Sequence, residues 1–285
     1  MLPSAFSTPP GREIPRPSAA TVRARLPLRE YTRPSKWWNA ARRRLFEKVL
    51  PGRVTLHPRG DVEHVGSEYG GWPVPLDLLD PDAIAYSVGA GGDVSFDHGL
   101  IERTGCEVHS FDPTAAAARH AAENERAGFT FHKVAVWTYA GELTMYGAAN
   151  PGHMALSAVN LQHTARTARV PCTTIEIVRE RLGHGEITLL KLTVDGGEYE
   201  LLPSFDLERW RTRVLIVNFQ HSRSVRSAVR AVARLQREGF VAVARRGTGI
   251  TFVHVRRSLT PPAGSEAPRI RRQHLPDRAA SPARP

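Results

Sequence analysis

The segment 85–114 constrains the fold most, because it joins two short apolar strands through a glycine-rich turn and a helix. In chain order it predicts a strand at 85–88, a turn with Gly89, Gly91 and Gly92, a helix at 94–103, a strand at 107–111 and a closing acid, Asp112. Small residues after the first strand let the backbone approach a ligand closely. An acid after the second strand can accept hydrogen bonds from two ribose hydroxyls. The segment therefore predicts a cradle for an adenine nucleoside.

Each part of this pattern also has a purely structural interpretation. A Gly-x-Gly sequence can serve only a tight turn between a strand and a helix. Asp112 precedes Pro113 and Thr114, and both Asp and Thr are good caps for the helix that follows. Asp93 and Asp97 flank the start of the first helix, where a negative side chain suits the helix dipole.

The rest of the folded region alternates strands and helices. Further strands are predicted at 129–136, 188–194, 214–219, 240–244 and 250–255, and further helices at 115–126, 174–182 and 225–238. Short apolar strands that alternate with helices indicate a parallel sheet covered on both faces. The last two strands are joined by a turn of hairpin length. We expect a doubly wound, seven-stranded, mostly parallel α/β sheet with a C-terminal antiparallel hairpin, and an irregular lid at 140–172.

The positive charge of the chain belongs to its ends. The net charge is +11, yet residues 1–60 hold 13 basic and 3 acidic side chains, residues 256–285 hold 7 and 2, and the middle is slightly acidic. Both ends are rich in proline and arginine, so residues 1–35 and 259–285 are predicted to be disordered tails. An acidic centre argues against a general nucleic-acid surface, and we expect no specific nucleic-acid partner.

Residues 36–80 are predicted to form a basic amphipathic helix and a linker, ahead of a main domain at 81–258. Apolar residues recur at helical spacing within 36–50, basic residues crowd the remaining positions, and a Pro-Gly pair ends the pattern. Such a helix either docks on the core or makes a weak peripheral contact with a membrane or an acidic partner. The sequence leaves both possibilities open.

The sequence predicts neither a membrane span nor export. No apolar run approaches the roughly 18 residues of a spanning helix, and residues 1–10 lack the basic start and apolar stretch of a secretory signal. Cys106 and Cys172 are the only cysteines, and the position of Cys106 favours a buried thiol over a disulfide or a metal site. We expect a cytoplasmic protein and assign no residue to a metal.

The most specific signature is the run at 189–202, which is LLKLTVDGGEYELL. Its apolar strand delivers Asp195 to the carboxyl edge of the sheet, where α/β proteins bind ligands, and a glycine pair turns the chain into a helix that begins at Glu198. This run resembles the LKIDVEGAE signature of the FkbM family of S-adenosylmethionine-dependent methyltransferases. The first region is similar to a branch of the same family, through Tyr-Ser-x-Gly-x-x-x-Asp-x-Ser-Phe-Asp and Phe-Asp-Pro-Thr. Together the resemblance covers about 86–255.

The resemblance implies a class I, Rossmann-like methyltransferase that uses S-adenosyl-L-methionine. The cofactor-binding residues that it implies are Gly89, Gly91 and Asp112 at the methionine turn and the ribose, and Val134 and Trp137 near the adenine. From its place at the start of the first helix, Asp93 is expected to face the methionine end of the cofactor. Trp137 also suits simple core packing. The resemblance places Asp195 and Glu198 at the edge of the active site. With His221, which remains as a further ionisable residue, they are the expected catalytic residues.

The sequence departs from the family signature at ionisable positions. Thr193 stands where the family usually has Asp, and Asp195 is shorter than the family's Glu. After the fifth strand the family's Val-Glu-Phe-His becomes Val-Asn-Phe-Gln, so that Asn218 and Gln220 precede His221. A carboxylate can act as a base or hold a metal, whereas Thr and Asn do neither well. His221 either deprotonates an acceptor hydroxyl or serves packing.

We therefore expect an O-methyltransferase that acts on a hydroxyl of a small molecule or sugar, the oxygen acceptor being implied by the resemblance alone. The alternative is a catalytically impaired relative that keeps cofactor binding for a binding or assembly role. A nicotinamide-dependent oxidoreductase would need a fuller glycine motif, and the sequence has Val94 at that point. No base-flipping motif of the Asn/Asp-Pro-Pro-Tyr type is present.

Overall fold

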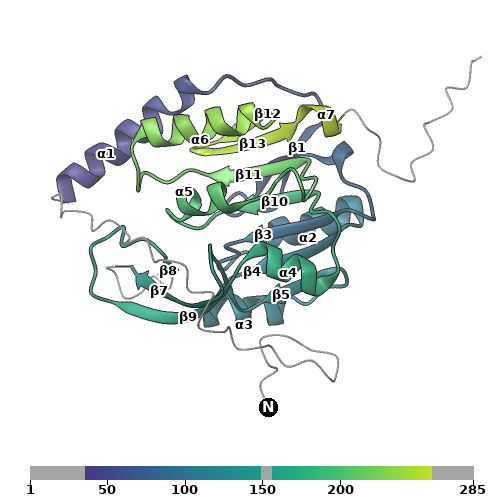
Figure 1. The fold of residues 1–285 in the computed structure, drawn as a ribbon, viewed down its shortest axis with the longest axis horizontal. Helices are drawn as coiled ribbons and strands as arrows, with labels where there is room; N and C mark the ends of the chain where they lie inside the picture. The colour runs from purple at the N-terminus through teal and green to yellow at the C-terminus, as the bar shows by residue number, and fades with distance from the viewer. Residues whose placement is uncertain (1–35, 149–155, 259–285) are drawn as a thin grey trace, which may run out of the picture.

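The computed structural model describes residues 36–148 and 156–258, and the predicted tails at 1–35 and 259–285 lie outside them. The main sheet has seven strands in the order β12-β13-β11-β10-β3-β4-β5 (Figure 1). Its strands are β3 (Ile84–Val88), β4 (Glu107–Phe111), β5 (Phe129–His132), β10 (Leu189–Leu192), β11 (Val214–Asn218), β12 (Phe240–Arg246) and β13 (Gly249–His254).

The main sheet is mostly parallel. Strands β11, β10, β3, β4 and β5 pair in parallel, whereas β13 pairs antiparallel with both β11 and β12. Successive residues of one strand enter different apolar cores, since Leu189 packs on one face and Leu190 on the other. Burial on both faces explains the continuous apolar runs of these strands. The predicted Rossmann-like α/β sheet is confirmed.

Helices cover both faces of this sheet. Residues of α2 pack into one core, whereas residues of α1, α4 and α6 pack into the other. Three helices begin where a Ser or Thr oxygen accepts a hydrogen bond from a backbone amide of the first turn, namely Thr114 before α3, Thr174 before α4 and Ser224 before α6. The helices are α1 (Lys36–Val49), α2 (Ser95–Thr104), α3 (Ala115–Glu123), α4 (Ile175–Leu182), α5 (Glu198–Leu201), α6 (Val225–Arg237) and α7 (Val255–Ser258). Among the described residues, no helix is long and apolar enough to span a membrane.

The region at 140–172 differs from the irregular lid that the sequence predicts. It contributes β7, β8 and β9 to a second, four-stranded sheet, whose order is β6-β9-β7-β8. The strands of this sheet are β6 (Ala135–Val136), β7 (Gly141–Gly147), β8 (Leu156–Ser157) and β9 (Thr167–Thr173). Leu143 and Met145 are buried while their neighbours in β7 are more exposed, a period-two pattern that suits a strand with one covered face. Residues 149–155 of the predicted lid lie outside the described residues.

The predicted linker contains a small hairpin of β1 (Val62–Val65) and β2 (Trp72–Pro75). Val65 and Val74 are fully buried and belong to the same core as Phe96 of α2. Thr251 also donates a hydrogen bond to the carbonyl of Pro73 at 2.7 Å. Because its side chains and backbone are anchored in this way, the hairpin is part of the folded unit and not a spacer.

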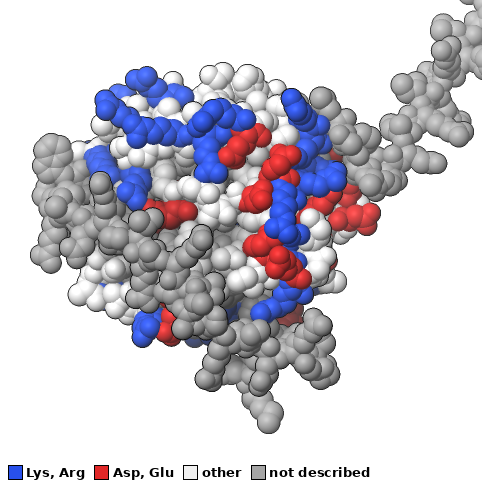
Figure 2. Space-filling view, viewed as in Figure 1, with Lys and Arg blue, Asp and Glu red and all other residues white. Residues whose placement is uncertain are grey.

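Helix α1 docks on the main domain. Phe46 and Leu50 are each 1% exposed and share a core with residues of α6, and Arg42 donates a hydrogen bond to the carbonyl of Ser222 at 2.9 Å. On the face of the molecule drawn in Figure 2, Lys and Arg side chains gather where α1 and α6 lie. The exposed basic residues of the two helices include Arg43, Arg44, Lys48, Arg226 and Arg230. Docking and a basic outer face therefore coexist in this helix.

Candidate active site

A cavity of about 600 Å³ lies at the carboxyl ends of β3, β4 and β10. This edge of a parallel α/β sheet is where ligands bind in such folds. The second sheet and the turn of the β1–β2 hairpin complete its walls. The lining residues are Tyr69, Gly70, Trp72, residues 88–93, 111–114, Ala116, residues 135–137, Leu143, Met145, Leu156, Ala158, Lys191, residues 193–195, Asn218 and Gln220.

The turn after β3 requires glycine at its first position. Gly89 has φ of +85°, and a Cβ atom placed there would lie 2.1 Å from the carbonyl oxygen of Thr193. The hydroxyl of Thr193 donates to the carbonyls of Val88 at 3.1 Å and of Gly89 at 2.9 Å. The turn is therefore pressed against the end of β10, an approach that only a residue without a side chain permits.

Gly91 and Asp112 are joined directly. The amide of Gly91 donates to Oδ2 of Asp112 at 3.0 Å, and Oδ1 accepts from both the amide of Thr114 at 2.9 Å and its hydroxyl at 2.6 Å. Asp112 lines the cavity and is 8% exposed. A Cβ atom on Gly91 would meet nothing within 4 Å, so the space beside the turn is open. Asp112 thus organises the chain locally and also lines the cavity.

Asp93 is held from two sides at the rim of the cavity. The hydroxyl of Ser67, in the β1–β2 turn, donates to Oδ2 at 2.5 Å, and the amide of Ser95 donates to Oδ1 at 2.8 Å. Burial raises the pKa of Asp93, but the hydrogen bonds from Ser67 and Ser95 outweigh it and hold the pKa below its ordinary value. Asp93 is therefore ionised at neutral pH and ties the hairpin to the glycine turn.

Asp195 is the carboxylate on the opposite side of the cavity from Asp112. Its φ of +46° is unusual for a residue with a side chain, and the hydroxyl of Ser157 donates to its carbonyl at 2.7 Å. The side-chain amide of Gln220 donates to Oδ1 at 3.0 Å. Burial raises the pKa of Asp195, and the negative charge of Asp112 adds to the rise against the opposing bond from Gln220. This carboxylate accepts a proton more readily than a free Asp does.

Glu198 lies behind the cavity wall, outside the lining, where it holds two backbone segments together. Its side chain is fully buried, accepts from the amide of Gly196 at 2.8 Å and accepts from the amide of Gln220 at 2.6 Å. Burial raises the pKa of Glu198 to about 8. The structure therefore places Glu198 where it positions Asp195 and Gln220.

His221 and Val134 also lie outside the cavity lining. His221 is partly buried, and burial followed by the charges of Arg42 and Arg43 lowers its pKa. His221 thus lies near α1, whose Arg42 donates to the carbonyl of the next residue, Ser222. Val134 is buried next to the lining segment 135–137, which includes the predicted residue Trp137.

Several lining residues are not anticipated by the sequence analysis. The turn residues Tyr69 and Gly70 come from the hairpin, and the apolar wall comes from the second sheet. Lys191 interrupts an apolar strand, which is the one sequence signal that points to it. Its Nζ donates to the hydroxyl of Ser87 at 3.1 Å. Burial lowers the pKa of Lys191 and raises that of the fully buried Asp97, and the charge of each residue opposes the shift of the other.

A family model described as the methyltransferase FkbM domain matches residues 83–242, which is more than half of the chain. The match includes every cavity residue except Tyr69, Gly70 and Trp72 of the β1–β2 hairpin. No curated protein shows significant similarity to the chain.

Two solved structures resemble the chain only distantly. The methyltransferase FkbM from Methylobacillus flagellatus KT has 11% sequence identity and a TM-score of 0.43, over 76% of this chain and 60% of that chain. A fibrillarin/Nop5p complex has 14% identity and a TM-score of 0.34, over 61% of this chain and 72% of that chain. The chain thus spans less than two thirds of the Methylobacillus protein.

Proposed function

This chain belongs to the FkbM methyltransferase family, and from that premise we propose that it transfers a methyl group from S-adenosylmethionine to a hydroxyl oxygen of a small molecule or sugar. The observation that carries the proposal is the arrangement of two carboxylates in one cavity. Asp112 stands beside the glycine turn, and Asp195 stands on the other side with a raised pKa.

The residues present fit an adenosine-type cofactor. Open space beside Gly91 and the close approach at Gly89 make a cradle that side chains would fill. In this proposal Asp112 accepts hydrogen bonds from the ribose hydroxyls, Asp93 lies at the methionine end, and Trp137 contributes apolar surface for the adenine. When bound, S-adenosylmethionine supplies a methyl group that its sulfonium has already activated.

The remaining task of the protein is to align the acceptor oxygen and to remove one proton. Asp195 is the residue proposed to receive that proton, because burial raises its pKa above the ordinary value, whereas hydrogen bonds hold the pKa of Asp93 below it. Gln220 holds Oδ1 of Asp195 at 3.0 Å and so orients the carboxylate. Leu143 and Met145 of the second sheet exclude water from this side and favour an acceptor with an apolar portion.

The departures from the family signature have roles in this geometry. The hydroxyl of Thr193 donates to two carbonyls, which an ionised Asp at that position could not do. Asn218 accepts a hydrogen bond from Thr248 at 3.1 Å, and Gln220 donates to Asp195. These neutral side chains hold the loops around the cavity. These hydrogen bonds support a catalytically active site over the alternative of a catalytically impaired relative.

The test begins with calorimetric titration of the full chain with S-adenosylmethionine, followed by methyl transfer from labelled cofactor to a panel of sugars and small hydroxyl compounds. We expect binding, and transfer that Asp195→Asn slows by about 10²-fold to 10⁴-fold. Absence of binding would contradict the proposal. Binding without transfer to any hydroxyl would instead favour the alternative, an impaired relative that keeps the cofactor for a binding or assembly role.

A further inference from the structure

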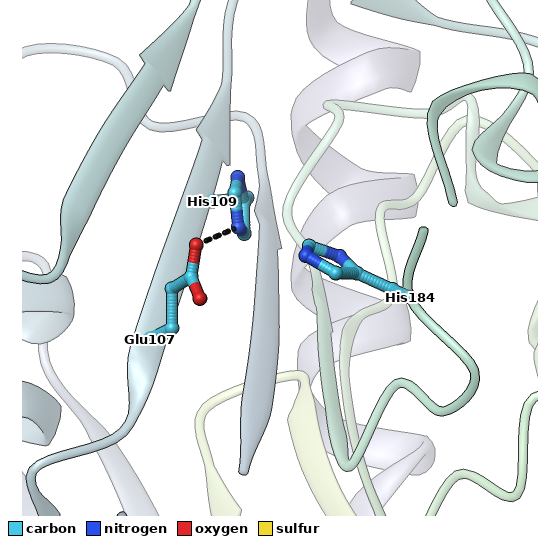
Figure 3. Close-up of side chains that lie close together, drawn as sticks. All are labelled: Glu107, His109 and His184. Carbon is cyan, nitrogen blue, oxygen red and sulfur yellow. Dashed lines mark hydrogen bonds and ion pairs between the residues drawn. The ribbon is translucent and has the colours of Figure 1, made fainter. Parts of the chain in front are cut away.

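Three side chains with metal-binding atoms meet away from the cavity. Glu107 and His109 lie on β4, and His184 lies in the loop after α4; one ligand atom of each falls within 4.8 Å of the others. Figure 3 shows His184 pointing from its loop toward the pair on β4. Oε1 of Glu107 is 2.8 Å from Nε2 of His109. Since Glu107 stands at the first residue of β4, this cluster is remote from Asp112 at the other end of that strand.

Nδ1 of His109 and Nδ1 of His184 each already have a partner outside the cluster. Nδ1 of His109 lies 2.9 Å from Nε2 of His132, and Nδ1 of His184 lies 2.8 Å from the hydroxyl of Tyr86. These contacts leave Nε2 of each ring, His109 and His184, facing the cluster. Metal-binding histidines commonly use their second nitrogen in this way, because the hydrogen bond fixes the ring and its tautomer.

We propose that Glu107, His109 and His184 bind a divalent first-row transition metal ion, with Zn²⁺ as the best match. Two imidazoles and one carboxylate form a common three-residue zinc set, which leaves a fourth position for water. In a tetrahedral set, two ligand atoms of one zinc ion lie about 3.3 Å apart, so side-chain movements of about 1.5 Å close the set. The ion takes the place of the Nε2 proton that His109 donates to Glu107. In the bound state the ring proton of His109 lies on Nδ1 and is donated to Nε2 of His132, whose own ring proton then lies on Nδ1.

The surroundings of the cluster suit an ion. His109 is 3% exposed in its side chain whereas Glu107 is 47% exposed, so the set has an inner anchor and an open side by which an ion enters. The bound ion would join β4 to the loop between α4 and β10.

The test uses the full chain after chelator treatment and dialysis. Zn²⁺ affinity is measured by competition with a chromophoric chelator, and Co²⁺ substitution reports low-coordinate nitrogen and oxygen ligation through its visible absorption. Glu107→Gln removes a half-exposed ligand with little risk to folding, and His184→Ala removes a second ligand. His57→Ala is the matched control, since His57 is exposed and outside the cluster.

We expect one ion per chain in the parent and in His57→Ala, and a loss of affinity on the order of 100-fold or more in Glu107→Gln and His184→Ala. Tyr86→Phe, which removes only the bond that orients His184, is expected to weaken binding about 10-fold to 100-fold. A parent chain that binds no zinc would overturn the proposal. Unchanged affinity in both Glu107→Gln and His184→Ala would overturn it equally. Cofactor binding is not part of this readout, so failure here is distinct from failure of the proposed function.

Discussion

The amide of Gly91 donates a 3.0 Å hydrogen bond to the carboxylate of Asp112, which joins the turn after β3 to the end of β4. One acid thus closes the turn and faces the cavity. The structural interpretation of Asp112 is therefore confirmed, because Thr114 uses one carboxylate oxygen and Gly91 the other. Its ligand-binding interpretation stays a prediction.

Asp112→Ala is expected to weaken the binding of S-adenosylmethionine. Charged hydrogen bonds are worth about 1.5–3 kcal/mol, so the dissociation constant should rise by about 10-fold to 100-fold. Titration calorimetry on the folded variant measures the change, with circular dichroism as the check on folding. A variant that is folded and binds the cofactor as tightly as the parent would show that Asp112 only closes the turn.

Three glycine substitutions should differ sharply in stability. Gly89→Ala combines a left-handed backbone with a clash against Thr193, and is expected to cost about 3 kcal/mol or more. Gly91→Ala keeps only the backbone strain, since its φ is +61° and no atom lies nearby, and should cost about 1 kcal/mol. Gly92→Ala has neither problem and is the control. Urea unfolding of the three variants measures the order, and equal losses for Gly89 and Gly92 would contradict the described turn.

The turn and its acid are predictable from the sequence because adjacent parallel strands place their carboxyl ends together. Gly89 and Asp112 follow consecutive strands of one strand–helix–strand unit, so their meeting depends only on chain order and strand length. Asp195 follows β10, which pairs directly with β3, and reaches the same edge. These contacts follow from topology alone.

Side-chain direction and weak local patterns are harder to predict. Glu198 follows Asp195 closely, yet its carboxylate turns back to two amides, because nothing in the residue order says on which side of the loop it points. The β1–β2 hairpin has strands of only four residues joined by a long turn. Such short strands do not show a clear two-residue alternation of apolar and polar side chains in the sequence. His109 and His184 meet only because the loop after α4 returns over β4.

Asp195→Asn is expected to lower turnover while it leaves cofactor affinity unchanged. Neutral Asn keeps the shape of the side chain but does not accept the acceptor proton, and a missing general base typically costs about 10²-fold to 10⁴-fold. In the parent, activity should fall as the pH drops through the raised pKa of Asp195. The acidic limb of the pH–rate profile should therefore have its midpoint above the ordinary Asp pKa of 3.8. The variant should lack this limb. Steady-state rates against pH, once an acceptor is known, measure both effects, and an identical limb in the variant would assign the base elsewhere.

Glu198 should make the protein less stable as the pH rises. Its folded pKa of about 8 exceeds its ordinary value of 4.5, so the folded state binds more protons than the unfolded state between these values. Its contribution is complete below about pH 4.5 and is lost as the pH rises through about 8. The loss amounts to several kcal/mol, at about 1.4 kcal/mol per pKa unit.

Urea unfolding at several pH values measures this slope. Glu198→Gln should flatten it, and Glu123→Gln, an exposed change on α3, should keep the parent slope. The assignment to Glu198 fails if Glu198→Gln retains the full dependence on pH.

Neighbouring residues of α1 should differ in their effect on stability. Phe46 is 1% exposed and packs in the core that α1 shares with α6, whereas Leu45 is 60% exposed. Phe46→Ala is expected to cost about 3–5 kcal/mol, and Leu45→Ala should stay within about 0.5 kcal/mol of the parent. The helix propensity of alanine is favourable at both positions, so the difference isolates docking from helix formation. Thermal and urea unfolding measure both variants. If the two substitutions lower the free energy of unfolding equally, α1 is not held by the core, and the helix could then separate from the domain.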